Sequence, residues 1–215
     1  ASIAATSVRI VADLAAALEA GDVLIDFTSP ETSLHHIKVC AEMGKAIVIG
    51  STGFSKEQLG LIAAFVTKIP CVLSPNMSIG VNLCFKILAE IAATIGEDYD
   101  MEIVEAHHRT KQDAPSGTAK TILQILDEEA GARQKMYGRE GMTERRNEIG
   151  VHVIRGGDTV GDHTVLFSKN FETIELSHRA VDRSVFASGA LMATRWVVGK
   201  KPGVYGMSDV LGLKK

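Results

Sequence analysis

The sequence is poor in cysteine, proline and aromatic residues, and it contains no long apolar run. Its 215 residues include three cysteines and five prolines, and 5% are aromatic. The odd number of cysteines and the lack of a metal-binding spacing predict buried, reduced thiols in a cytoplasmic protein. The longest apolar run, near Leu61–Val66, is far too short to cross a bilayer, so we expect no membrane partner.

The sequence also has no large excess of charges of one sign. Lysine and arginine together number 23 against 26 acidic residues, a net charge of −3. Without a positive field to attract phosphates, a nucleic-acid partner is not expected. The 46% hydrophobic and 23% charged residues are typical of one large or two small globular domains. Residues 1–7 lack a charged start followed by an apolar core, so no signal peptide is predicted.

The first third of the chain alternates between helical and strand-like patterns. Short apolar runs at Val23–Thr28, Ala46–Ser51 and Cys71–Asn76 predict strands, the first two buried on both faces. Helical patterns precede and separate them, at residues 11–20, 30–43 and 55–68. This alternation predicts parallel strands joined by right-handed crossovers, as in a doubly wound Rossmann-type sheet.

After Asn76 the pattern changes. Apolar residues spaced by four predict a long helix from Ile79 to Gly96. Further strands are predicted at residues 100–106, 149–155, 164–169 and 171–180, and helices at 116–130 and 183–198. The short connections between the later strands predict a mixed or antiparallel sheet. Residues 133–147 are expected to form an exposed loop and residues 203–213 a tail. The prediction is an α/β fold divided after residues 78 and 182.

The densest polar cluster is E-A-H-H-R-T-K-Q-D-A-P-S-G-T at residues 105–118, between a predicted strand and a predicted helix. Its histidines, arginine and lysine suit a substrate that carries carboxylates or phosphates. If Ser116 caps the helix, the backbone N–H groups of Gly117, Thr118 and Ala119 form an anion site. The alternative is a solvated basic loop beside an ordinary helix cap.

The same segment resembles the signature of the dihydrodipicolinate reductase (4-hydroxy-tetrahydrodipicolinate reductase) family. Further segments are similar to the family in the same order, namely residues 22–31, 48–54, 74–82, 157–165, 176–180 and 183–190. The resemblance implies a partial Rossmann dinucleotide-binding domain (1–78), a substrate-binding and tetramerisation domain (79–182) and a segment that returns to the first domain (183–215). It also implies a homotetramer that uses NADH or NADPH to reduce a cyclic dicarboxylate in lysine and diaminopimelate biosynthesis.

The resemblance further implies roles for individual residues. His107 takes the acid/base position and Lys111 the position of the proton donor; the alternative for His107 is that it only orients Lys111 or the substrate. His108 matches a substrate contact, and Gly117 with Thr118 matches the backbone pair that holds a carboxylate. The cofactor-binding positions are Gly50, Ser51, Thr52, Ser74, Pro75, Asn76 and Met77. A tight turn is the alternative for Gly50.

Other histidines carry weaker signals. His35 and His36 are expected on a helix surface, His152 and His178 in the core of strands, and His163 as a brace of the substrate domain. No spacing of histidines and acids supports a metal site.

The chain departs from the family in one respect. Nothing before Val23 has the form of the glycine-rich dinucleotide fingerprint. The chain is therefore expected to begin after that unit, to bind cofactor poorly by itself, and to carry an exposed sheet edge.

Two other functions stay open. A semialdehyde dehydrogenase requires an activated cysteine nucleophile, and Cys40, Cys71 and Cys84 lie in predicted helices or a buried strand. A non-catalytic module that binds dicarboxylates or oligomerises is the second alternative.

Overall fold

The computed structural model describes residue 8 and residues 10–213. The predicted absence of a signal peptide at 1–7 falls outside these residues, as does the end of the predicted 183–215 segment. The chain divides into two compact units. The first runs to Ser74 and includes Ala190–Gly206; the second comprises Pro75–Gly189 and continues from Met207. Among the described residues, no helix has both the length and the apolar character needed to cross a membrane.

The first unit contains a four-stranded parallel sheet. In spatial order its strands are β1 (Val23–Asp26), β2 (Ala46–Ile49), β3 (Pro70–Leu73) and β9 (Gly203–Tyr205). Helices α1 (Leu14–Glu19), α2 (Pro30–Met43) and α3 (Lys56–Phe65) precede β1, β2 and β3, respectively. The parallel pairing of β1 with β2 and of β2 with β3 confirms the predicted Rossmann-type arrangement.

Local sequence accounts for the ends of these helices. The Ser29 hydroxyl accepts a hydrogen bond from the Thr32 backbone N–H at the start of α2. Gly44 ends the same helix with φ of 66°, a conformation that suits glycine. Ser55 and Gln58 form a reciprocal capping box at the start of α3.

Two expectations for this unit were wrong. β1 is an edge strand, and Ile25 on it is 39% exposed, so the strand is not buried on both faces. Residues 203–205 form β9 rather than part of a tail, and they pair with β3. A three-residue strand carries too little periodic pattern to be recognised, because its partner comes from a distant part of the chain.

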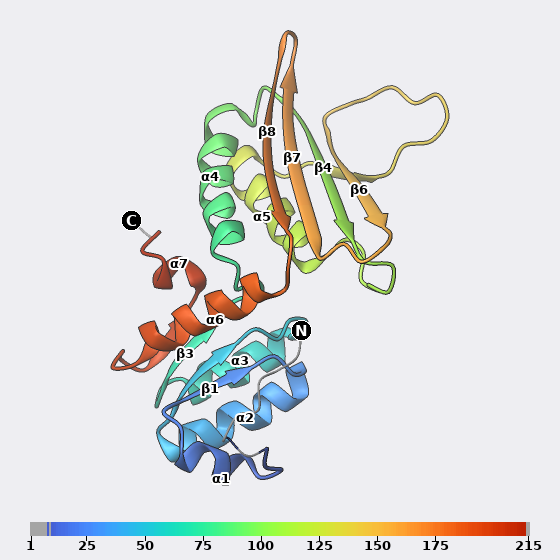
Figure 1. Cartoon of the computed structure of the whole chain (residues 1–215). Helices are drawn as coiled ribbons and strands as arrows, with labels where there is room; N and C mark the ends of the chain where they lie inside the picture. Colours follow the sequence, from blue (N-terminus) through green and yellow to red (C-terminus); the bar gives the residue numbers. More distant parts are fainter. Residues whose placement is uncertain (1–7, 9, 214–215) are drawn as a thin grey trace. The chain divides into compact units, whose positions relative to one another are not determined.

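The second unit combines two long helices with a five-stranded mixed sheet. Its elements up to β8 are α4 (Ile79–Ile95), β4 (Asp100–His107), α5 (Gly117–Ala130), β5 (Gln134–Tyr137), β6 (Glu148–Arg155), β7 (Gly161–Lys169) and β8 (Glu172–Ala180). Helices α4 and α5 cover one face of the sheet (Figure 1). The core between them includes Leu88, Leu126, Ile103 and Phe167. Helix α6 (Ser184–Val197) begins in this unit and ends in the first, and α7 (Met207–Val210) belongs to the second.

The order of the sheet, β5-β6-β4-β7-β8, corrects the expected pairing of consecutive strands. β4 lies between β6 and β7, parallel to the first and antiparallel to the second. Residues 156–158 therefore connect two strands that do not pair. Among the strands that the structure describes in this unit, only β7 and β8 form a consecutive antiparallel pair, whose turn contains Asn170 with φ of 45°.

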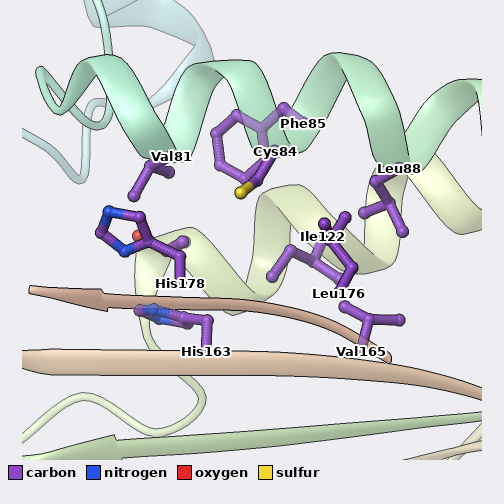
Figure 2. A pocket seen from close by; sticks show the side chains of 10 residues that line it. Val81, Cys84, Phe85, Leu88, Ile122, His163, Val165, Leu176 and His178 are labelled. Carbon is purple, nitrogen blue, oxygen red and sulfur yellow. The ribbon is translucent and has the colours of Figure 1, made fainter. Parts of the chain in front are cut away.

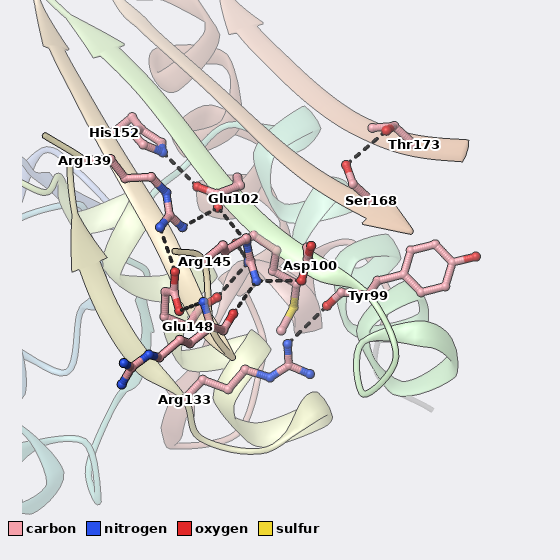
Figure 3. A network of polar contacts seen from close by, with 12 residues as sticks. Tyr99, Asp100, Glu102, Arg133, Arg139, Arg145, Glu148, His152, Ser168 and Thr173 are labelled. Atoms are coloured by element: carbon pink, nitrogen blue, oxygen red, sulfur yellow. Dashed lines mark hydrogen bonds and ion pairs between the residues drawn. The ribbon is translucent and has the colours of Figure 1, made fainter. Parts of the chain in front are cut away.

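The segment expected to be an exposed loop is ordered by ionic contacts (Figure 3). It begins with β5, which pairs with β6. Arg139 then contacts Glu102 at 2.9 Å and Glu148 at 2.7 Å, and Arg145 contacts Asp100 at 2.5 Å. Residues 140–144 and 146–147 are exposed and irregular, so the expected exposed loop is confirmed there, while the contacts of Arg139 and Arg145 hold this loop to the sheet.

Candidate active site

The chemistry-bearing motif begins at the carboxyl end of β4. Alternate residues of this strand, Met101, Ile103, Glu105 and His107, are buried, because they face the layer of helices. The same face thus changes from an apolar core to a polar pair at the end of the strand. His108, one position further on, is only partly buried.

Glu105 is the centre of the buried polar cluster. Its Oε1 atom accepts hydrogen bonds from the Ser116 backbone N–H at 2.9 Å and from Arg155 Nη2 at 3.1 Å. Its Oε2 atom lies 2.9 Å from His107 Nδ1. Burial raises the pKa of Glu105, but the contacts with His107, Ser116 and Arg155 outweigh burial and hold the pKa well below its usual value. Glu105 is therefore a carboxylate at neutral pH.

His163, on β7, completes the cluster. Its ring meets the His107 ring edge-on, with 5.0 Å between the centroids. Burial and then the neighbouring His107 lower the pKa of His163 to about 4, so this imidazole is neutral at physiological pH. Its Nε2 atom lies 3.2 Å from the Ser116 hydroxyl.

The sequence spacing did not suggest a metal site, yet the fold gathers three side chains of kinds that can bind a metal. One ligand atom from each of Glu105, His107 and His163 lies within 4.8 Å of the others. The carboxylate already has a guanidinium and a backbone N–H as partners, and this arrangement opposes a second cation. The absence of a metal therefore stays a prediction.

The four cationic side chains of the motif do not form one cluster. His107 points into the buried network, and Arg109 is exposed. Lys111 Nζ lies 2.7 Å from Asp113 Oδ1, so the nearest charge to the lysine is an anion. His108 Nδ1 instead lies 2.8 Å from the Thr110 hydroxyl. Asp113 belongs to the same sequence motif, but the spacing of the cationic residues does not reveal its pairing with Lys111.

The start of α5 offers two backbone donors. The Ser116 hydroxyl accepts from the Ala119 N–H at 3.1 Å, so Ala119, which the sequence placed in the anion site, is already satisfied. The N–H groups of Gly117 and Thr118 have no partner within the described part of the chain. The space beside the Gly117 backbone is open. A carboxylate fits such a pair at a helix N-terminus.

Residues of the predicted cofactor loops follow the parallel strands of the first unit. Gly50, Ser51 and Thr52 come after β2, and Ser74 comes after β3. Because β2 and β3 are parallel, these loops lie at the same edge of the sheet, where dinucleotides bind in open α/β folds. The remaining predicted cofactor residues, Pro75, Asn76 and Met77, begin the second unit.

Contacts of the first unit explain the loop after β2. The Ser51 hydroxyl accepts a hydrogen bond from the Ser33 hydroxyl at 3.0 Å. A Cβ atom at Gly50 would lie 2.3 Å from the ring of Phe27, which is 50% exposed, so a larger residue at this position would displace that ring. Asp26 accepts from the Thr28 backbone and hydroxyl at 2.9 and 2.7 Å and shapes the end of β1. Burial opposes ionisation, but these hydrogen bonds keep the pKa of Asp26 below its usual value.

An apolar cavity of about 20 Å³ lies between α4, α5 and the β7–β8 hairpin. Figure 2 shows Phe85 and Cys84 from α4 opposite Leu176, with the rings of His163 and His178 at one end. This volume holds about one water molecule, so the cavity is too small for a dicarboxylate. His178 Nε2 lies 3.4 Å from the Ser78 hydroxyl and contributes to this wall.

Sequence reasoning missed two residues of the buried network, Glu105 and Arg155. Glu105 was part of the quoted motif, and its position two residues before His107 was the available signal, since residues i and i+2 share a strand face. Arg155 gave no such signal. It stands opposite His107 only because β6 pairs with β4.

Comparisons with known proteins confirm the resemblance. The family model described as the C-terminus of dihydrodipicolinate reductase matches residues 80–211, and the model described as its N-terminus matches residues 1–77. The chain is 65% identical over 195 residues to 4-hydroxy-tetrahydrodipicolinate reductase of Methanoregula boonei, covering 90% of this chain and 76% of the relative. It is 52% identical over 215 residues to the enzyme of that name from Geobacter sulfurreducens, covering 98% of this chain and 81% of the relative.

A solved structure of a protein with the same family name also matches this chain. The dipicolinate-bound dihydrodipicolinate reductase from Paenisporosarcina sp. TG-14 superposes with a TM-score of 0.73 at 28% identity. The superposition covers 91% of this chain and 76% of that one.

Proposed function

Because this chain belongs to the dihydrodipicolinate reductase family, we propose that it uses NADH or NADPH to reduce 4-hydroxy-tetrahydrodipicolinate to tetrahydrodipicolinate. The observation that carries the proposal is the arrangement at the end of β4. His107 is joined through Glu105 to Ser116, and Ser116 caps the helix whose first two N–H groups are free for a carboxylate. Such a site suits an anionic substrate that must receive a proton.

The reaction determines what the residues must do. After the 4-hydroxyl leaves as water, the conjugated imine gains a hydride at one end and a proton at the other, which yields tetrahydrodipicolinate. The nicotinamide cofactor supplies the hydride. The negative charge that develops on the substrate must be neutralised by a nearby acid.

The residues of the motif have different roles in this reaction. The N–H groups of Gly117 and Thr118 hold one substrate carboxylate, and His108 contacts the substrate. Lys111 donates the proton and releases Asp113 to do so, and His107 serves as the acid/base group. The presence of two carboxylates on the substrate accounts for the use of both a helix N-terminus and cationic side chains.

The loops of the first unit suit the dinucleotide. The glycine at position 50 and the hydroxyls of Ser51, Thr52 and Ser74 lie where parallel strands end. Asn76 and Met77 continue the second loop. This donor set fits the ribose and nicotinamide through neutral hydrogen bonds, and it contains no charged group that would select between NADH and NADPH.

The thiols do not favour a semialdehyde dehydrogenase. Burial raises the pKa of Cys71 to about 12 and that of Cys40 to about 11, so neither is a thiolate at neutral pH. Cys84 also has its pKa raised by burial.

We also propose a cytoplasmic homotetramer. The face of the mixed sheet that points away from α4 and α5 carries Val104, Leu166 and Ile154, and Ile154 is 53% exposed. Joining such faces would remove apolar surface from water. Light scattering combined with gel filtration tests this assembly, and a monomeric mass would refute it.

The function is tested by two measurements on the protein. The first follows NADH or NADPH oxidation with freshly prepared synthase product, and the second measures thermal stability with and without pyridine-2,6-dicarboxylate. Turnover with stabilisation supports the reductase. Stabilisation without turnover supports a dicarboxylate-binding module instead, and the absence of both refutes the proposal.

A further inference from the structure

Glu105 is a charged side chain on the core face of a central strand. The side chain has 0% exposure and follows Met101 and Ile103 in the same inward row. A carboxylate in such a place is stable only if every oxygen has a partner. The contacts of Glu105 therefore indicate what it does.

The two oxygens of Glu105 face different groups. Oε1 has two donors, the Ser116 N–H and Arg155 Nη2, and the same Arg155 nitrogen also donates to the Asp113 carbonyl at 2.7 Å. This side of the carboxylate ties the motif loop and the start of α5 to the sheet. Oε2 accepts no hydrogen bond of good geometry within the described part of the chain; the nitrogens near it are His107 Nδ1 at 2.9 Å and His163 Nε2 at 3.7 Å.

A carboxylate only accepts hydrogen bonds, and a bare nitrogen lone pair 2.9 Å from Oε2 would be repelled, so the distance favours the Nδ1–H tautomer of a neutral His107. The other nitrogen, Nε2, is then free to accept or deliver a proton. It lies beside Gly161, where a Cβ atom would be only 3.1 Å away. Two further titratable groups near the ring are Arg155, opposite it on β6, and His163 on β7.

We propose that Glu105 is a positioning residue that fixes the Nδ1–H tautomer of His107 and so makes Nε2 the nitrogen through which His107 serves as the acid/base group, with Lys111 as the proton donor. Arg155 and the Ser116 N–H hold the carboxylate in the orientation that this requires. The role in turnover rests on the proposed function, but the tautomer itself can be observed without any activity.

Glu105→Gln tests the proposal because a carboxylate can accept hydrogen bonds at both of its oxygens, whereas an amide has one accepting oxygen and one donating NH₂ group. The side of Oε1 has two donors, so the amide oxygen must stay there, and the amide NH₂ then faces His107 Nδ1. The histidine has to accept at Nδ1, and its hydrogen moves to Nε2. The variant keeps the shape of the site and inverts the tautomer.

The readout is ¹⁵N NMR of histidine-labelled protein, with the His107 signals identified by their loss in His107→Gln. We expect Nδ1–H in the wild type and Nε2–H in Glu105→Gln. We also expect kcat to fall about 100-fold, while the affinity for pyridine-2,6-dicarboxylate changes by less than about threefold.

Glu102→Gln is the matched control. Glu102 lies on the same strand but on the opposite face, and it is held by Arg139, Arg145 and His152 (Figure 3). The substitution removes a comparable set of ionic contacts without touching His107. We expect it to preserve the tautomer of His107 and kcat.

Wild-type His107 carrying its hydrogen on Nε2 would overturn the proposal, even if Glu105→Gln failed to fold. An unchanged tautomer in Glu105→Gln would overturn it as well. If the wild type showed Nδ1–H but neither turnover nor dicarboxylate binding, the proposed function would fail and the tautomer assignment would stand.

Discussion

The side-chain amide of Asn76 donates a hydrogen bond to the hydroxyl of Thr118, with 3.1 Å between Nδ2 and Oγ1. The two residues are 42 positions apart. The amide oxygen of Asn76 also accepts from the Ser78 N–H at 2.8 Å. The bond therefore joins the predicted cofactor segment after β3 to the first turn of α5, where we place a substrate carboxylate.

Thr118→Val removes this hydroxyl and preserves the shape of the side chain. We predict that affinity for pyridine-2,6-dicarboxylate falls about two- to tenfold, the usual effect of losing one hydrogen bond. Isothermal titration measures the change. Thr118→Ser keeps the hydroxyl and should bind nearly as the wild type does; equal losses in both variants would contradict a role for the hydroxyl.

Lys111→Ala is predicted to reduce kcat by at least about 100-fold, because it removes the proposed proton donor. The affinity for NADH or NADPH should change by less than about twofold. Steady-state kinetics and cofactor fluorescence measure the two quantities. Lys120→Ala removes an equal charge from the exposed surface of α5 and should retain kcat. Normal turnover in Lys111→Ala would exclude the lysine as the donor.

Gly161→Ala is predicted to lower kcat about tenfold without unfolding the protein. The new Cβ atom would lie 3.1 Å from His107 Nε2, and the ring cannot retreat without losing its 2.9 Å contact with Glu105. Gly156→Ala is the control, because no atom lies within 4 Å of its Cβ position. Kinetics and thermal melting distinguish the two; wild-type kcat in Gly161→Ala would show that the ring has room to move.

Acid should destabilise the fold through His163. Its pKa falls from 6.5 to about 4 on folding, so between these values the unfolded chain binds a proton that the folded chain does not. Stability therefore decreases as the pH falls from 6.5 towards 4, by up to about 3 kcal/mol in total. Burial also lowers the pKa of His178, which adds to the effect in the same direction.

Urea unfolding at about pH 7 and about pH 5 measures this dependence. His163→Gln should show a clearly smaller loss than the wild type. His35→Gln, an exposed position on α2, should show the same loss as the wild type. If His163→Gln lost as much stability between these two pH values as the wild type does, other groups would be the cause of the acid destabilisation.

Much of the fold follows from local sequence. Ser29 and Gly44 mark the ends of α2, Ser116 marks the start of α5, and apolar runs mark the parallel strands. These features act within a few residues, so a single sequence displays them. The two-residue period of β4 likewise places Glu105 and His107 on the same buried face.

The tertiary structure determined which residues that are distant in the sequence become neighbours. The pairing of β4 with β6 brings Arg155 opposite His107, and the antiparallel β7 brings His163 to the same buried cluster. The short strands β5 and β9 likewise exist only through their partners. No local pattern encodes such neighbours, because they arise from strand order and register.

The sequence by itself determined the family, the α/β class and the motif that carries the chemistry. The tertiary structure alone decided that this motif is not a cluster of exposed cations. It separates into a buried imidazole on a carboxylate, a lysine paired with Asp113 and two donors at a helix end. The physical reason is that burial and pairing set the charge and proton position of each group, and both depend on residues far away in the chain.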